Sequence, residues 1–446
     1  MVRVSLLGLG PVGLVTALCF VKRGYRVIGI DVDKYRIEKI RKGELPFVEP
    51  SLDNYLNSAI KSGMFEATTD TSLNKAADVS FITVGTPSAE DGDVDLTYVR
   101  SAATEIGKSL RDRAEYQLVL VKSTVLPGTA RNVVKPLLEE YSGKRLGKGF
   151  GLCANPEFLR EGKAIYDSEF PNRIVIGGEH ENDLDFSESF YKEFYGQRMP
   201  PVVKTTYENA ELIKYASNSF LAMKVSYINM IANLCQKVED ADVQDVAKGI
   251  GLDERIGPRF LNAGVGWGGS CFPKDVKALS AFGKKINVET SLVNAARSIN
   301  EHQPSKAIEL AERLIGDFRG RKVAVLGLSF KPDTDDIREA VSIPLVNNLL
   351  SKGAEVVVYD PAAMPNARSE LPKDVTFAPT ALECITGADC CILVTEWDEF
   401  KRLPAQFFKE KMRYPAVVDG RRIFSPSEFI QSGVKFSAIG LGGHEI

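Results

Sequence analysis

The front part of the chain alternates short apolar runs with amphipathic stretches. Apolar runs over residues 1–7, 25–30, 79–84 and 117–122 predict buried strands, and the stretches between them carry apolar residues at helical spacing. Such alternation favours a mostly parallel sheet with helices on both faces. We therefore expect a doubly wound α/β domain over residues 1–200.

A long stretch without Pro or Gly follows this predicted domain. Residues 207–239 keep apolar side chains at helical spacing, which predicts one long helix. Its apolar surplus indicates a core position or an interface with a second subunit rather than a cofactor site. We expect this helix in a central helical domain over residues 201–310.

The pattern of strands and helices begins again toward the end of the chain. Apolar runs at 322–326 and 355–359 flank a helical stretch at 342–352, and the second run ends at Asp360. This is a second nucleotide-type βαβ unit without the glycine fingerprint of the first. We expect a Rossmann-like domain over residues 311–446 that holds a different nucleotide. The alternative is an inactive duplicate with an architectural role only.

The first predicted turn carries a G-x-G-x-x-G fingerprint between a strand and a helix. Gly8 allows a tight turn, Gly10 lets the backbone approach a pyrophosphate, and Gly13 lets the helix pack closely on the strand. Asp31 ends the second strand, where its carboxylate can accept hydrogen bonds from a ribose hydroxyl and repels a 2′-phosphate. NAD is therefore expected over NADP, although Arg36 nearby softens that preference.

Composition narrows the classes of function. The 446 residues carry a formal net charge of −3 and no long basic run, so nucleic acid is not an expected partner. Seven cysteines without a C-x-x-C pair indicate a reducing cytoplasm, and three histidines without ligand spacing predict no metal site. Residues 4–21 are uncharged, but their glycines and Pro11 argue against a signal peptide or membrane span.

The strongest sign of covalent chemistry is Cys271, which follows a run of glycines around Trp267. Such a loop lets backbone N–H groups converge on a ligand. Pro273 suits the first turn of a helix, and a thiol at the start of a helix is a better nucleophile. Asp275, four residues on, should face the same side. The alternative, a buried structural cysteine, is what we expect for the other six.

Lys214 and Asn218 stand four residues apart on the predicted long helix. A cation and an amide on one helix face can stabilise an oxyanion. By itself, such a pair is typical of a solvated helix face. It gains a chemical meaning only if that face meets Cys271.

Together these segments resemble the nucleotide-sugar 6-dehydrogenases, the UDP-glucose/GDP-mannose dehydrogenases. The likeness covers nearly the whole chain and rests on residues 8–13, 122–125, 155–162, 209–218, 264–275 and 330–338. It implies two Rossmann-like domains, one for NAD and one for UDP, joined by a long central helix at a homodimer interface. It also implies a four-electron oxidation of UDP-glucose to UDP-glucuronate with NAD as cofactor.

The resemblance implies catalytic roles for six residues. Thr124 and Asp275 would hold the water that accepts the hydroxyl proton. Cys271 would trap the aldehyde as a thiohemiacetal and carry it to a thioester, which Glu157 would help to hydrolyse. Lys214 and Asn218 would steady the oxyanions.

Binding contacts also carry over by position. Cofactor contacts fall on Gly8, Gly10, Val12, Gly13, Asp31, Arg36, Thr86, Thr124, Glu161, Lys274 and Arg338. Substrate contacts fall on Glu157, Phe158, Leu159, Arg160, Glu161, Lys214, Asn218, Arg255, Phe260, Leu261, Asn262, Ala263, Gly264, Gly268, Lys331 and Arg421. Arg and Lys suit a pyrophosphate because they combine charge with donors, and some of these could reach it across subunits.

Other readings stay open beside UDP-glucose oxidation. The same chemistry could act on GDP-mannose or on a UDP-N-acetylhexosamine. Residues 255–261 resemble the UDP-glucose members more than the GDP-mannose ones, and residues 155–158 argue against acetylated sugars. A non-catalytic sensor of NAD or nucleotide sugar is the alternative from another class. The presence of Cys271 with its polar partners argues against it, because a sensor needs no nucleophile.

Overall fold

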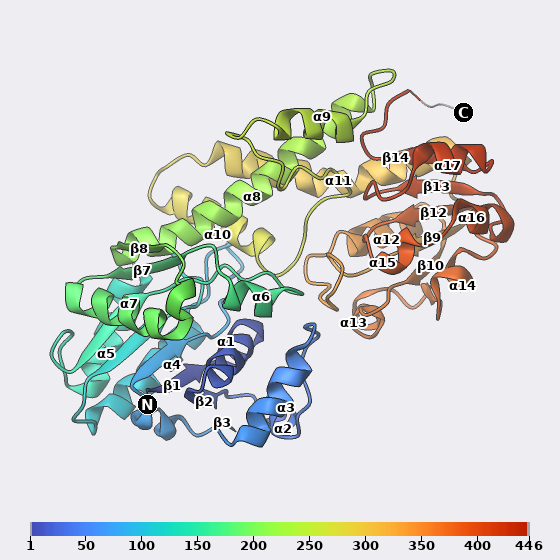
Figure 1. Ribbon diagram of the computed structural model, residues 1–446. Coiled ribbons are helices and arrows are strands. Elements are labelled where there is room, and N and C mark those ends of the chain that lie inside the picture. Colours follow the sequence, from blue (N-terminus) through green and yellow to red (C-terminus); the bar gives the residue numbers. More distant parts are fainter. Residues whose placement is uncertain (1, 444–446) are drawn as a thin grey trace. The chain divides into compact units, whose positions relative to one another are not determined.

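The computed structural model describes residues 2–443. The chain divides into two compact units, Met1–Ser217 and Asn218–Ile446. Each unit contains one sheet covered by helices, and the long helix α8 (Tyr207–Cys235) begins in the first unit and ends in the second (Figure 1). The predicted class, α/β with two Rossmann-like doubly wound domains, is confirmed.

The first unit is built on an eight-stranded sheet with the order β3-β2-β1-β4-β5-β6-β7-β8. The pairing of β6 with β7 is antiparallel, and the other neighbouring pairs are parallel. The strands are β1 (Arg3–Leu7), β2 (Arg26–Ile30), β3 (Phe65–Thr68), β4 (Val79–Ile82), β5 (Gln117–Val121), β6 (Phe150–Ala154), β7 (Ile174–Gly178) and β8 (Val202–Thr205). The α-helices are α1 (Pro11–Lys22), α2 (Lys34–Arg41), α3 (Leu52–Ser62), α4 (Thr97–Arg111), α5 (Lys135–Ser142), α6 (Ala164–Glu169) and α7 (Glu181–Tyr195). Two 3₁₀ helices, η1 (Thr71–Ala76) and η3 (Gly196–Arg198), and one π-helix, η2 (Ala130–Val134), also occur.

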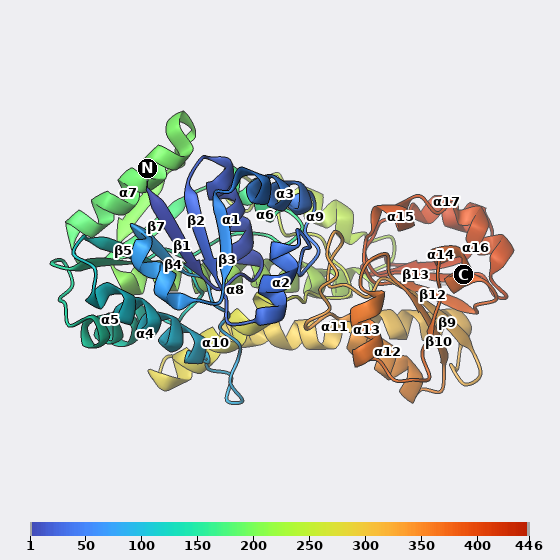
Figure 2. The same cartoon turned by 90° about the horizontal axis from the view of Figure 1, so that it is seen from below.

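Both faces of this sheet are buried, which explains its continuous apolar strands. Along β5, Leu118 and Leu120 pack into the core that contains α1 and α7, while Val119 and Val121 pack into the core that contains α4 and α5. Figure 2 shows α1 and α3 on one side of the strands and α4 and α5 on the other. Alternate strand residues thus face opposite helical layers, as in other doubly wound sheets.

The second unit is built on a six-stranded, parallel sheet with the order β11-β10-β9-β12-β13-β14. The strands are β9 (Lys322–Leu326), β10 (Glu355–Tyr359), β11 (Thr376–Phe377), β12 (Cys390–Leu393), β13 (Ala416–Asp419) and β14 (Lys435–Ala438). The helices are α9 (Val243–Gly251), α10 (Phe272–Lys285), α11 (Ser291–Ile315), α12 (Ser342–Ser351), α13 (Met364–Glu370), α14 (Ala381–Ile385), α15 (Asp398–Lys401), α16 (Ala405–Lys411) and α17 (Pro426–Gln431). Ile228 of α8 and Ala311 of α11 belong to the core on one face of this sheet.

The strand order reverses beside the first strand of each sheet, between β1 and β4 and between β9 and β12. Ligands of open α/β sheets bind outside the carboxyl ends of the strands at such a point. In the first unit, Thr83 Oγ1 donates to the carbonyl of Gly8 at 2.8 Å. In the second, Thr395 Oγ1 donates to the carbonyl of Ser329 at 2.6 Å. The two units therefore repeat one local arrangement.

The fingerprint glycines satisfy three different steric demands. Gly8 has φ +103, and a β-carbon there would lie 2.7 Å from the carbonyl oxygen of Thr83. A β-carbon on Gly13 would lie 1.9 Å from the carbonyl oxygen of Gly8. A β-carbon on Gly10 would meet no atom within 4 Å, so the backbone is open on that side. The open side at the start of α1 fits the close approach of a pyrophosphate.

These geometries give opposite outcomes for two similar substitutions. We expect Gly13→Ala to lower the free energy of unfolding by about 1–3 kcal/mol because the added carbon overpacks the turn. We expect Gly10→Ala to lower it by less than about 1 kcal/mol, the scale of a helix-cap change, yet to weaken dinucleotide binding. Thermal unfolding and titration with NAD measure the two effects. Unchanged NAD affinity in Gly10→Ala would contradict the role assigned to Gly10.

Candidate active site

The first unit brings a buried ion pair to the carboxyl ends of its strands. Glu157 follows β6, and Lys214 lies on α8. The Lys214 ammonium donates to Glu157 Oε1 at 2.9 Å, with side chains 4% and 8% exposed. Lys122, directly after β5, donates to Asn155 Oδ1 at 3.3 Å. The strand ends and α8 thus collect two ammonium groups and one carboxylate.

The charged groups in this cluster shift one another's pKa values. Burial by itself would raise the pKa of Glu157, but Lys214, the Leu159 amide and Lys122 outweigh it, so the pKa lies below its ordinary value. Burial lowers the pKa of Lys122 to about 8, opposed by Glu157 and reinforced by Lys214. The carboxylate of Glu157 is therefore ionised at neutral pH, while Lys122 is poised near the pH at which it loses its proton.

Asn155 fixes the base of this cluster. Its side-chain amide donates to the carbonyl of Val175 at 2.9 Å, and its oxygen accepts from both the Tyr191 hydroxyl and Lys122. The Asn155 and Tyr191 side chains are buried, so these bonds satisfy polar groups that water does not reach. These hydrogen bonds therefore hold the start of the loop that carries Glu157 in place.

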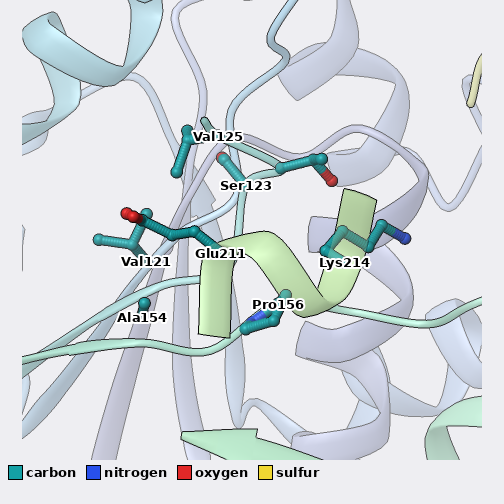
Figure 3. Close-up of a pocket in the computed structure, with 8 residues that line it drawn as sticks. Val121, Ser123, Val125, Ala154, Pro156, Glu211 and Lys214 are labelled. Carbon is teal, nitrogen blue, oxygen red and sulfur yellow. The ribbon is translucent and has the colours of Figure 1, made fainter. Parts of the chain in front are cut away.

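Thr124 lies in the loop after β5 and is tied to the loop after β4. The Thr86 hydroxyl donates to the carbonyl of Thr124 at 2.9 Å, and the Ser123 hydroxyl donates to the carbonyl of Val84 at 2.6 Å. Thr124 and Lys214 line the same small cavity, in which Figure 3 labels Lys214 beside Ser123 and Val125. Two of the predicted catalytic residues therefore come together in the first unit.

The second unit presents Cys271 at the start of a helix, as the sequence predicts. Cys271 is the N-cap residue of α10, with Pro273 in the first turn, and it is partly exposed while the other six cysteines are buried. The backbone before it requires glycine. Gly269 has φ +90, and a β-carbon on Gly268 would lie 2.2 Å from the carbonyl oxygen of Glu339.

Asp275, one turn after Cys271, sits between two donors. The Asn218 amide donates to Asp275 Oδ2 at 2.5 Å, and the Lys274 ammonium donates to Oδ1 at 2.6 Å. The Asp275 side chain is 1% exposed. Because a buried carboxylate must be paired, these bonds hold it in one orientation beside the start of α10. Asp275, Asn218 and Lys274 thus form one hydrogen-bonded group, one turn after Cys271.

Side chains from α8 and α11 hold the glycine loop through Trp267. Asn300 Oδ1 accepts from the Trp267 amide at 2.7 Å, and its Nδ2 donates to the Trp267 carbonyl at 2.8 Å. The indole of Trp267 donates to the Ser226 hydroxyl at 2.9 Å. The loop is therefore anchored at its centre by a bidentate amide and a buried hydroxyl.

Arg421 also holds this loop, a role that the sequence did not indicate. Its guanidinium donates to the carbonyls of Val394, at 2.6 Å, and Gly266, at 2.8 Å. A β-carbon on Gly264 would lie 3.0 Å from that guanidinium, and the Gly264 amide donates to Asn229 Oδ1 at 2.8 Å. The predicted substrate contact of Arg421 stays a prediction beside this observed one.

Other predicted contact residues pair within their own segments. Guanidinium–carboxylate pairs at 2.6–2.8 Å join Arg36 to Asp31, Arg160 to Asp167, Arg255 to Asp253 and Arg338 to Asp336. The arginine side chains of these pairs are 34–86% exposed, whereas the carboxylates of Asp31, Asp167 and Asp336 are 5–11% exposed. The guanidinium carbon of Arg173 lies 3.7 Å from the centre of the Phe158 ring, and the ammonium nitrogen of Lys331 lies 5.2 Å from the centre of the Phe330 ring. Among the residues after Phe260, which has φ +64, Asn262 is exposed, whereas Leu261, Ala263 and Gly264 are buried.

The acidic residue after the second strand is used differently in the two units. In the first, Asp31 accepts from the Leu9 amide at 2.7 Å and from Arg36. In the second, one oxygen of Asp360 accepts from the amides of Leu328 and Ser329 and from the indole of Trp397. Both carboxyl groups therefore accept from the amide of the second residue after the first strand, and Arg36 binds Asp31 where the indole of Trp397 binds Asp360.

The sequence analysis assigned no separate role to Lys122, Asn155 or Glu211, although each lies in a segment that carries the resemblance and is buried or half-buried. A usable signal was present for Glu211. It precedes Lys214 by three residues and Asn218 by seven, which places all three polar groups on one side of a helix. A polar stripe on a helix of otherwise apolar character indicates partners elsewhere in the fold.

Between residues 2 and 443, none of the helices has both the length and the apolar character needed to cross a bilayer. Within the same described residues, no three His, Cys, Asp or Glu side chains are grouped so as to hold a metal ion.

Three domain models of one family match the chain in order. They are the NAD binding domain (residues 2–195), the central domain (208–302) and the UDP binding domain (324–426) of the UDP-glucose/GDP-mannose dehydrogenase family. UDP-glucose 6-dehydrogenase AglM of Haloferax volcanii is 42% identical over 427 residues, which span 96% of this chain and 98% of that protein. UDP-glucose 6-dehydrogenase TuaD of Bacillus subtilis is 38% identical over 99% of this chain and 93% of its own length.

Solved structures agree with this assignment. A UDP-glucose dehydrogenase from the archaeon Pyrobaculum islandicum has a TM-score of 0.89 and 40% identity, covering 96% of both chains. A UDP-D-ManNAc dehydrogenase from Pyrococcus horikoshii has a TM-score of 0.86 and 28% identity, covering 99% of this chain and 100% of its own. The first unit of the present chain is an NAD-binding domain, and NAD is the cofactor. The chain belongs to the UDP-glucose/GDP-mannose dehydrogenase family of NAD-dependent oxidoreductases.

Proposed function

We propose that this enzyme oxidises the C6 hydroxyl of UDP-glucose to the carboxylate of UDP-glucuronate, reducing two NAD. Relatives named for UDP-glucose that match nearly the full chain support this substrate. The observation that carries the chemistry is the setting of Cys271. It is a partly exposed thiol at the start of α10 in a glycine loop, with a fixed carboxylate one turn on.

The first oxidation needs an acceptor for the hydroxyl proton. We assign this role to Asp275 and Thr124, acting through a water molecule, while NAD supplies the hydride acceptor for both oxidations. The bonds from Asn218 and Lys274 support the assignment because they keep Asp275 in place. The products of this step are an aldehyde at C6, one NADH and one proton.

The second oxidation proceeds through sulfur. The Cys271 thiolate adds to the aldehyde carbon, a C–S bond forms, and the carbonyl electron pair moves to oxygen. Donors from Lys214 and Asn218 suit this oxyanion. Loss of the second hydride leaves a thioester, so the reactive aldehyde stays bound while the first NADH is replaced.

Hydrolysis completes the reaction. Water adds to the thioester carbon, the C–S bond breaks, and Cys271 leaves as the thiolate. We assign the removal of the water proton to Glu157. The Glu157 carboxylate is ionised at neutral pH and so can accept a proton, and the bond from Lys214 holds it in place.

The same chemistry on an acetylated sugar is the second candidate, since the Pyrococcus horikoshii relative is named for UDP-D-ManNAc. The stretch Asn155 to Phe158 argues against it. Free thiols at all seven cysteines support a reducing compartment such as the cytoplasm as the place where the enzyme works.

We also infer a homodimer that uses α8. Exposed apolar side chains repeat every seven residues along it, at Phe220 (57% exposed), Tyr227 (49%) and Leu234 (59%). Seven residues are two helical turns, so these side chains form one stripe. A contiguous exposed apolar stripe is typical of an interaction surface, and a second copy of the same helix is the partner we propose.

The number of NADH molecules released per sugar tests the proposed reaction. We expect two NADH for each UDP-glucose consumed, measured by absorbance with limiting substrate. We expect kcat/KM for UDP-glucose to exceed that for GDP-mannose or a UDP-N-acetylhexosamine by on the order of tenfold or more. One NADH per sugar would mean that the reaction stops at the aldehyde. An enzyme that is inactive with UDP-glucose would overturn the proposed substrate.

Mass spectrometry of the intact protein tests the sulfur intermediate. We expect Glu157→Gln to slow thioester hydrolysis, so that the sugar nucleotide accumulates on Cys271 during turnover. The matched control, Cys271→Ala with Glu157→Gln, should show no adduct. Cys271→Ala alone should bind UDP-glucose normally but form glucuronate roughly 10³-fold or more slowly, as expected for loss of a nucleophile. Normal turnover by Cys271→Ala would remove the thiol from the mechanism.

Sedimentation velocity tests the interface. We expect wild-type enzyme to sediment as two chains, and Tyr227→Asp with Leu234→Asp to sediment as one, because burying carboxylates in an apolar contact is costly. Asn209→Glu, which adds a charge to an exposed position at the start of the same helix, should leave the dimer intact. Wild-type protein that sediments as a single chain would exclude the proposed interface.

A further inference from the structure

The loop that follows β5 depends on α8 for two of its backbone hydrogen bonds. This loop carries Thr124 and leads into η2. The amide of Gly128 donates to Glu211 Oε2 at 2.6 Å, and the amide of Ala130 donates to Glu211 Oε1 at 2.8 Å. Both oxygens of one side chain therefore hold the same loop, which fixes its position and its orientation.

Glu211 is unusual because it is an ionisable residue at a buried position of α8. Its side chain is 3% exposed, and it lies three residues before Lys214 on α8. Figure 3 shows the Glu211 carboxyl and the Lys214 ammonium pointing away from each other from neighbouring turns of the helix. Because Lys214 pairs instead with Glu157, the carboxyl of Glu211 is committed to the loop amides.

The held loop and the reactive side chains surround one small cavity. Its lining includes Ser123, Thr124, Glu211 and Lys214, and its volume is about 10 Å³. That volume is on the order of one water molecule. Thr124 thus lies beside Lys214 only as long as the loop stays against α8.

Burying the ionisable carboxyl group of Glu211 costs free energy, so packing alone does not explain this residue. Burial raises its pKa to about 8, the Ala130 and Gly128 amides oppose that rise, and Glu208 adds to it. A raised pKa means that folding favours the protonated form. The contribution of Glu211 to stability is therefore present below its unfolded pKa, about 4.3, and is lost as the pH rises through about 8. At neutral and alkaline pH, an ionisable group here works against stability.

We propose that Glu211 is a positioning residue: its carboxyl holds the loop of residues 124–130 against α8 and so keeps Thr124 in place for the first oxidation. The inference rests on the proposed function for the role of Thr124. The anchoring itself rests only on the two amide bonds and the shared cavity.

Hydrogen exchange tests the anchor without any substrate. In Glu211→Ala, we expect the amides of Gly128 and Ala130 to exchange on the order of tenfold or more faster, because they lose their acceptor. Glu211→Gln keeps one carbonyl acceptor and should give an intermediate rate. The matched control is Glu208→Gln, which lies one turn earlier on α8 and pairs with Arg131 of η2 at 2.5 Å. It should leave the exchange of Gly128 unchanged.

A comparison of two substrates tests the positioning. Thr124 is assigned to the alcohol step, so Glu211→Gln should lower kcat for UDP-glucose by on the order of tenfold. The kcat for the corresponding C6 aldehyde, and the KM for UDP-glucose, should stay within about twofold of wild type. A role in stability alone would lower both rates together by reducing the active fraction.

The outcomes separate the two proposals. Unchanged exchange at Gly128 and Ala130, or equal loss with both substrates, would overturn the positioning role of Glu211. An equal effect of Glu208→Gln would do the same. Wild-type enzyme that does not oxidise UDP-glucose would overturn the proposed function, while faster exchange in Glu211→Ala would still support the anchor. If Glu211→Ala fails to fold, Glu211→Gln carries both measurements.

Discussion

Three polar side chains on one helix must each find a buried partner, and this requirement organises the site. Glu211, Lys214 and Asn218 of α8 are 3%, 3% and 7% exposed. Unpaired polar groups at such burial cost several times what an ordinary hydrogen bond contributes. Glu211 binds the amides that lead into η2, Lys214 binds Glu157, and Asn218 binds Asp275. The register of α8 is therefore coupled to the three segments that carry the proposed chemistry.

The two sheets share a strand order but differ in how the loop after the first strand is used. In the first unit, Gly10 leaves an open side at the start of α1. In the second, Ser329 stands two residues after Gly327, as Gly10 stands two residues after Gly8. The Ser329 side chain is buried, and its hydroxyl and the indole of Trp397 both donate to Asp360. The open side at Gly10 is thus replaced in the second unit by a buried side chain. One topology therefore carries different loops at the same place, and such local differences, rather than the fold, decide what each unit can bind.

Much of the fold could be predicted because its signals are local. The strand of residues 322–326, the start of α10 at Cys271 and the turn at Gly8 follow from apolar runs, Pro273 and the glycine spacing. The predicted long helix of residues 207–239 ends earlier, at Cys235, and Asp240 adopts φ +59. No Pro or Gly marks that end, so only the contacts of the following turn decide it. The division into three domains at residues 200 and 310 stays a prediction.

The sequence by itself determined most of the elements, the open glycine turn and the cysteine at the start of a helix, because each depends on neighbours a few residues away. Only the tertiary structure decided which partner each ionisable group takes. Lys214 reaches Glu157 across 57 residues, and Arg421 reaches the Gly266 carbonyl across 155. The local pattern does not say which group each of them binds. Their partners are chosen by the packing of distant strands and helices, because burial leaves each charged group few groups to bind.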